Sequence, residues 1–100
     1  MKAGSGEMRT DVPLKLSEHV HYVRLDDQVI VADMRSGDYL GLDGAGARAW
    51  ELIGSRAARG AILKRLSTEY DVAPDVLRRD VDQFLQDLLR RGLIEYDTSR

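Results

Sequence analysis

The stretch GDYLGLDG at residues 37–44 decides how this chain of 100 residues is interpreted. Its central part, YLGL at residues 39–42, predicts a short β-strand. The Asp-Gly pair that follows, at residues 43–44, is typical of a turn that caps a helix. Gly37 suits a tight turn before the strand, because glycine tolerates a positive φ. We therefore expect the chain to change from strands to helices at this stretch.

Two strand-like segments precede the stretch. Residues 19–25 are rich in β-branched and aromatic side chains, and residues 29–32 are continuously apolar. Polar turns at residues 26–28 and 35–38 join these segments to each other and to the strand at 39–42. We therefore expect an antiparallel three-stranded meander in which the segment 29–32 is central and the other two strands are edges.

Three helices are expected after the stretch. Apolar side chains recur at helical spacing in residues 45–53, 61–70 and 74–91, and Gly60 is expected to precede the second helix. Residues 93–96 are compatible with a short extended segment. A run of strands followed by a run of helices predicts the α+β class, with an outline like that of a winged helix-turn-helix.

Composition narrows the class of protein. The length allows one domain, expected at residues 14–97 behind a flexible arm at residues 1–13. The absence of cysteine excludes disulfides, thiolate metal sites and cysteine nucleophiles. A net charge of −2 does not favour nucleic-acid binding. We expect a cytoplasmic protein without a membrane partner, because neither a signal peptide nor a long apolar run is present.

The polar residues form no convincing catalytic or metal-binding pattern. His19 and His21 lie on one face of a strand, but no further His or Cys completes a metal site. Gly44 and Gly46 precede a helix, but Ala49 stands where a dinucleotide-binding loop has its third glycine. The serines lack the surroundings of a hydrolase nucleophile. We therefore expect no enzyme activity, no metal site and no cofactor.

The strand at residues 39–42 is expected to have an open backbone edge. Edge strands usually carry Pro, Lys or a bulge that prevents further pairing, and this segment has neither Pro nor Lys. Gly41 allows another backbone to approach closely. Two interpretations stay open: an incoming peptide adds a strand here, or the edge is covered by residues 93–96 or by a second copy of the chain.

The third helix offers an apolar face beside this edge. Its apolar stripe is wide enough to pack on the core and to leave one margin accessible. Leu77 and Phe84 lie at one margin and Leu89 lies at the other, and the sequence leaves open which of the two faces the edge strand. Its arginine pairs alternate with aspartates. A DNA-recognition helix is disfavoured, because these carboxylates would face phosphates.

These features resemble the PqqD-like family, whose members are peptide-binding modules also called RiPP recognition elements. The resemblance extends over residues 20–96. It rests on the strand-to-helix stretch and on the apolar pattern of the later helices, as seen at residues 37–43, Gly46, residues 50–53, residues 62–70, Asp80, Val81, Phe84, Leu85, Leu88 and residues 92–94.

The resemblance implies that the chain binds the N-terminal leader of a ribosomally synthesised precursor peptide. In this family the leader adds as a strand beside the third strand, in a groove walled by the third helix. The residues expected to contact the peptide are Tyr39, Leu40, Gly41, Leu42, Leu77, Asp80, Val81, Phe84, Asp87 and Arg91.

A free-standing module of this size is most similar to the one used in lasso-peptide pathways. Such a module delivers the leader to a separate leader peptidase, and a cyclase then closes the ring. Two alternatives remain: a PqqD-type chaperone of pyrroloquinoline quinone biosynthesis, and a winged-helix DNA-binding regulator. The chain is expected to be a monomer or a weak dimer.

Overall fold

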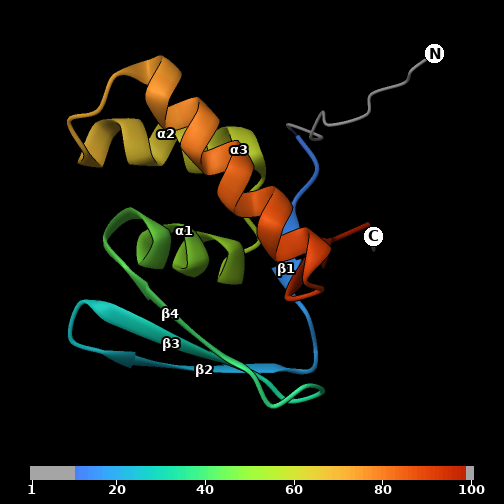
Figure 1. Cartoon of the computed structure of the whole chain (residues 1–100). Helices are drawn as coiled ribbons and strands as arrows, with labels where there is room; N and C mark the ends of the chain where they lie inside the picture. The colour runs from blue at the N-terminus through green and yellow to red at the C-terminus, as the bar shows by residue number, and fades with distance from the viewer. Residues whose placement is uncertain (1–10, 99–100) are drawn as a thin grey trace.

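The computed structural model describes residues 11–98 and confirms the α+β class (Figure 1). The elements follow one another as β1 (Leu14–Leu16), β2 (Val20–Leu25), β3 (Gln28–Asp33), β4 (Tyr39–Asp43), α1 (Gly44–Gly54), α2 (Arg59–Glu69), α3 (Pro74–Arg90) and β5 (Ile94–Tyr96). In Figure 1, α1 lies between the β2–β3–β4 sheet and the pair formed by α2 and α3. Residues 1–10 of the expected arm lie outside the described residues.

The main sheet is the predicted antiparallel meander, with β3 in the centre. The turn between β3 and β4 depends on Gly37, whose φ is +82°, as expected from its place in the sequence. Two side chains hold this turn: Asp33 Oδ1 accepts the amide of Arg35 at 2.9 Å, and Ser36 Oγ accepts the amide of Asp38 at 3.1 Å. The start of β4 is therefore fixed by local hydrogen bonds.

The sequence did not predict the second sheet, in which β1 pairs with β5. Leu14 lies opposite Tyr96, and Leu16 lies opposite Ile94. The C-terminal segment therefore pairs with β1 and does not cover β4. This excludes the interpretation in which residues 93–96 cover the edge of β4. Pro13, placed at the end of the arm, bridges to Ala58.

One local expectation about the helix starts is wrong. Gly60 lies in the first turn of α2, which begins at Arg59, and not in front of the helix. Asp43 occupies the N-cap position of α1 as predicted, although its side chain makes no capping hydrogen bond. The chain enters α1 through Gly44, whose φ is +53°.

The core fills the space between the inner face of the main sheet and the helices. Trp50 is fully buried, and the ring of Tyr22 packs edge-on against it with centroids 5.9 Å apart. The other buried apolar side chains come from both sheets and all three helices, and they include Leu14, Val29, Val31, Leu42, Ile53, Ile62, Leu66, Leu77, Val81, Leu85, Leu88 and Ile94. Burial of this apolar surface is the main source of stability.

Ion pairs orient the helices around this core. Arg48 of α1 pairs with Glu69 of α2 at 2.9 Å, and Arg59 of α2 pairs with Asp82 of α3. The hydrogen bonds from Arg48 lower the pKa of the Glu69 carboxyl. Such partly exposed pairs contribute little to stability, so their main effect is on orientation. Among residues 11–98, no helix has the length and apolar character needed to cross a membrane.

Candidate functional site

One side of β4 has no partner strand among residues 11–98. The strand order is β2–β3–β4, and β5 belongs to the other sheet. On the occupied side, Ile30 lies opposite Gly41, and Ala32 lies opposite Tyr39. β4 is therefore an open edge, as predicted from its sequence.

The register shows which backbone groups face outward from this edge. The amide of Asp33 donates to the carbonyl of Asp38 at 2.9 Å, so these two residues occupy a hydrogen-bonded position of the ladder. Hydrogen-bonded and non-hydrogen-bonded pairs alternate along antiparallel strands. Leu40 therefore bonds to β3, whereas Tyr39 and Gly41 direct their N–H and C=O groups away from it.

The side chains of β4 alternate between the two faces of the sheet. Leu42 is 8% exposed and Leu40 is half-buried, and both lie on the inner face with the core. Tyr39 and Gly41 lie on the outer face, where the Tyr39 side chain is 76% exposed. The edge therefore combines outward-directed backbone groups with apolar side chains on the helix side.

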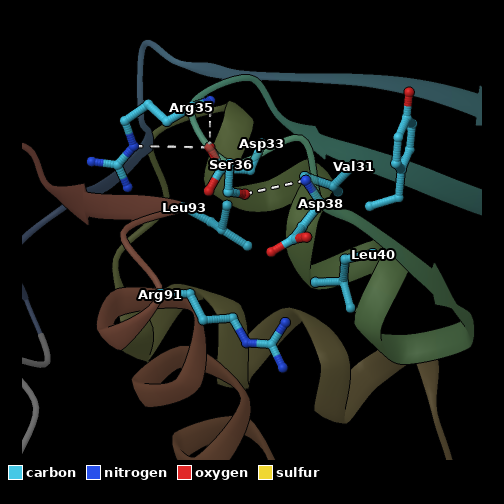
Figure 2. A pocket seen from close by; sticks show the side chains of 9 residues that line it. Val31, Asp33, Arg35, Ser36, Asp38, Leu40, Arg91 and Leu93 are labelled. Carbon is cyan, nitrogen blue, oxygen red and sulfur yellow. Dashed lines mark hydrogen bonds and ion pairs between the residues drawn. The ribbon is translucent and has the colours of Figure 1, made fainter.

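A cavity of about 410 Å³ lies between the β3–β4 turn and the C-terminal end of α3 (Figure 2). We call it the turn pocket. Its base is apolar and its rim is charged, because it is lined by Val31, Asp33, Arg35, Ser36, Asp38, Tyr39, Leu40, Arg91 and Leu93. In Figure 2, Arg91 reaches toward the pocket from α3, and the Asp38 carboxylate points into it from the turn.

A second cavity, of about 270 Å³, lies among the three helices next to the end of β4. We call it the helix pocket. It is mainly apolar and is lined by Ala45, Gly46, Ala49, Leu66, Val72, Leu77, Asp80, Val81 and Phe84. A Cβ atom at Gly46 would lie 3.7 Å from Phe84 and 4.0 Å from Leu42, so both side chains lie close to Gly46. The two pockets and these two side chains form what we call the β4–α3 groove.

The charges around the turn pocket are mostly paired. Arg91 Nε lies 3.1 Å from Asp87 Oδ2, and Arg35 Nε lies 3.8 Å from Asp33 Oδ1. The pKa of the Asp33 carboxyl is lowered, above all by the hydrogen bond from the Arg35 amide and also by His19 at 3.8 Å. Asp33 therefore stays ionised and holds the turn.

The structure distributes the ten expected contact residues over the groove and its surroundings. Tyr39, Leu40 and Arg91 line the turn pocket, whereas the members from the first part of α3 line the helix pocket: Leu77, Asp80, Val81 and Phe84. Gly41 lies at the open edge, and Leu42 is buried on the inner face of β4. Asp87 lines neither pocket and pairs with Arg90 and Arg91.

Burial separates these residues into two kinds. Leu77 and Val81 are 6% exposed and belong mainly to the core. Phe84 is half-buried and therefore has surface left for a ligand. Among the residues that sequence reasoning missed is Asp38, although its position two residues before Leu40 places it on the same face of β4.

Comparison with known proteins agrees with this geometry. The family model for coenzyme PQQ synthesis protein D (PqqD) matches residues 28–94. The solved structure of TbiB1 in complex with the TbiA(beta) leader peptide is 30% identical, covers 85% of this chain and 99% of that chain, and has a TM-score of 0.77.

A second solved structure supports the fold alone. Lasso peptide synthetase B1 complexed with the leader peptide is 20% identical, covers 83% of this chain and 98% of that chain, and has a TM-score of 0.74. None of the curated proteins matches the chain.

Proposed function

Because this chain belongs to the PqqD family, we propose that its β4–α3 groove binds the leader of a ribosomally synthesised precursor peptide as an added β-strand. The observation that carries the proposal is the outward direction of the N–H and C=O groups of Tyr39 and Gly41. Tyr39 itself lines the turn pocket, and the lining of the helix pocket begins at Ala45, two residues after β4. The similarity to TbiB1, whose structure holds the TbiA(beta) leader peptide, supports it.

The leader gains affinity from two sources in this proposal. Main-chain hydrogen bonds to Tyr39 and Gly41 each contribute about 0.5–1.5 kcal/mol net. An apolar leader side chain buried beside Phe84 contributes about 1.5–3 kcal/mol when fully buried. A disordered leader must also become ordered, which costs free energy. The sum is compatible with a dissociation constant below about 1 μM.

Binding then serves delivery and not catalysis. The module holds the leader while a separate leader peptidase, and after it a cyclase, acts on the same precursor. Docking on these enzymes raises the effective concentration of the precursor at their active sites. We place this delivery in the cytoplasm, together with the synthesis of the precursor.

Two alternatives have weaker support. A role in pyrroloquinoline quinone biosynthesis fits the family, but the similarity to TbiB1, whose structure holds a leader peptide, favours the binding of a leader peptide. A DNA-binding role would need cationic side chains on α3 to be free for phosphates. Instead, Arg78, Arg79, Arg90 and Arg91 each lie near an aspartate of the same helix.

Titration with a leader peptide tests the proposal. The probe is a fluorescein-labelled synthetic leader of the short precursor gene nearest to the gene for this chain, with a scrambled peptide and a short DNA duplex as controls. Fluorescence anisotropy should give a dissociation constant below about 1 μM for the leader and at least about 100-fold weaker binding for both controls. Equal binding of the scrambled peptide, or tighter binding of the duplex, would contradict the proposal.

A further inference from the structure

The turn pocket contains one carboxylate that the protein itself does not neutralise. Within residues 11–98, the Asp38 carboxylate makes no ion pair and accepts no hydrogen bond. Only the backbone of Asp38 is engaged: its amide donates to Ser36 Oγ, and its carbonyl accepts from the amide of Asp33. Figure 2 shows the carboxylate pointing into the pocket. A ligand that enters the pocket therefore meets an uncompensated negative charge.

The cations of the same pocket have partners. Arg91 faces Asp87 at 3.1 Å, and Arg35 faces Asp33 at 3.8 Å. The Arg35 side chain also lies over the end of α3, where its Nη2 atom would be 2.8 Å from a Cβ at Gly92. A leader carboxylate would have to compete for these guanidinium groups, whereas a leader cation finds Asp38 free.

Asp38 directly precedes β4 and continues its register opposite Asp33, which places this charge in line with the apolar groove. Asp38, Leu40 and Leu42 alternate with the outward-facing residues and so share the inner face of the strand. In an added antiparallel strand, the residues opposite these three occupy the close pairs, with Cβ atoms about 4.5–5.5 Å apart. The leader residues opposite Asp38 and Leu42 are four positions apart, and the second of them reaches Phe84.

We propose that the turn pocket selects a lysine or arginine of the bound leader, four positions from an apolar residue that packs beside Phe84. The aliphatic stem of the cation lies on Leu40 and Leu93 at the base of the pocket, and its charged end pairs with Asp38. The inference rests on the proposed function, because it requires the leader to lie along β4.

Selection from a random peptide library tests the inference independently of any natural leader sequence. Peptides of about 14 residues, long enough at about 3.3 Å per residue to span the groove, are displayed on bacteria and sorted for binding to the wild-type protein. Peptides that no longer bind the Gly41→Pro variant depend on the open edge. We expect this set to be enriched in Lys or Arg four positions from a large apolar residue.

Substitutions at Asp38 then test whether this side chain causes the preference for Lys or Arg. Asp38→Asn should weaken an edge-dependent peptide about tenfold and reduce the salt dependence of its affinity. Asp38→Lys should shift the enrichment at that position from Lys and Arg to Asp and Glu. The matched control is Asp71→Asn, an exposed position between α2 and α3, which should leave the selected peptides unchanged.

The possible outcomes separate this inference from the proposed function. Edge-dependent peptides with no cation preference would overturn the inference and leave leader binding intact. A preference for Asp or Glu would overturn the inference as well, and it would indicate that Arg91 is the residue that recognises the leader side chain in this pocket. If no peptide depends on the open edge, both the proposed function and the inference fail.

Discussion

The two edges of the main sheet differ, although both belong to short antiparallel strands. On β2, the amide of Met34 donates to the carbonyl of His19 at 2.8 Å, so alternation makes Tyr22 and Arg24 the residues with outward-facing backbone groups. β2 thus has unpaired groups like those of β4. The edges differ in what lies beside them on the helix side.

Two side chains of β2 lie against α1 next to its edge, and the cavity of about 260 Å³ beside Arg24 is lined mainly by polar and charged side chains. Tyr22 packs edge-on against Trp50, and Arg24 pairs with Glu51 of α1. Beside β4, by contrast, lie the turn pocket and the helix pocket. Unpaired backbone groups are therefore not sufficient for a peptide-binding edge; the edge must also have room for the side chains of the incoming strand.

The largest expected effect comes from proline at the open edge. Gly41→Pro removes an outward N–H without removing a bond to β3, and its ring occupies the path of the added strand. We expect leader affinity to fall at least about tenfold, because a strand hydrogen bond is lost and the backbones are kept apart. Arg24→Pro, which removes an outward amide of β2, should change the affinity by no more than about threefold.

A matched substitution checks that the loss of leader affinity comes from the missing N–H and not from the added side-chain atoms. A Cβ at Gly41 would meet only Ile30 Cδ1, at 3.8 Å, so Gly41→Ala fits the fold and keeps the N–H. Leader affinity of this variant should stay close to that of the wild type. If Gly41→Pro is folded by circular dichroism and binds the leader as the wild type does, the leader does not lie along β4.

The two edges also show which features of the fold can be predicted from the local sequence. The alternation and turn residues of one strand are local, so the open edge at residues 39–42 and the positive φ of Gly37 were predictable. β1 was not, because its three residues form a strand only by pairing with β5 at the other end of the chain. The burial of Leu14 and the ion pair between Arg59 and Asp82 depend on similar distant contacts.

The groove itself was only partly predictable. Helical spacing identified an apolar stripe on α3 with two margins, but it did not show that the margin with Phe84 lines the helix pocket. It also did not show that Leu77 and Val81 belong mainly to the core. The turn pocket joins the β3–β4 turn to the end of α3, far apart in the sequence. No local pattern shows that Arg91 faces this turn.

A smaller effect is expected from Phe84, which has no counterpart beside β2. Phe84→Ala removes the apolar surface of the groove and should weaken leader binding about tenfold. The control is Leu89→Ala, a partly buried position on the same helix that lines neither groove pocket. Both variants should lose stability, by about 1–2 kcal/mol, because each side chain is only partly buried. Calorimetric titration should show weaker binding only for Phe84→Ala, and equal losses would show that the groove is not the site.

The smallest effect concerns the turn that begins β4. The pKa of Asp33 is lowered in the folded state, chiefly by the Arg35 amide. The stabilisation it provides is fully present above the unfolded pKa of about 3.9 and is lost as the pH falls through the lower folded value. Asp33→Asn should therefore be less stable than the wild type at neutral pH, and the difference should narrow as the pH falls below about 4. Urea unfolding at a series of pH values measures this, and a constant difference would show that ionised Asp33 does not hold the turn.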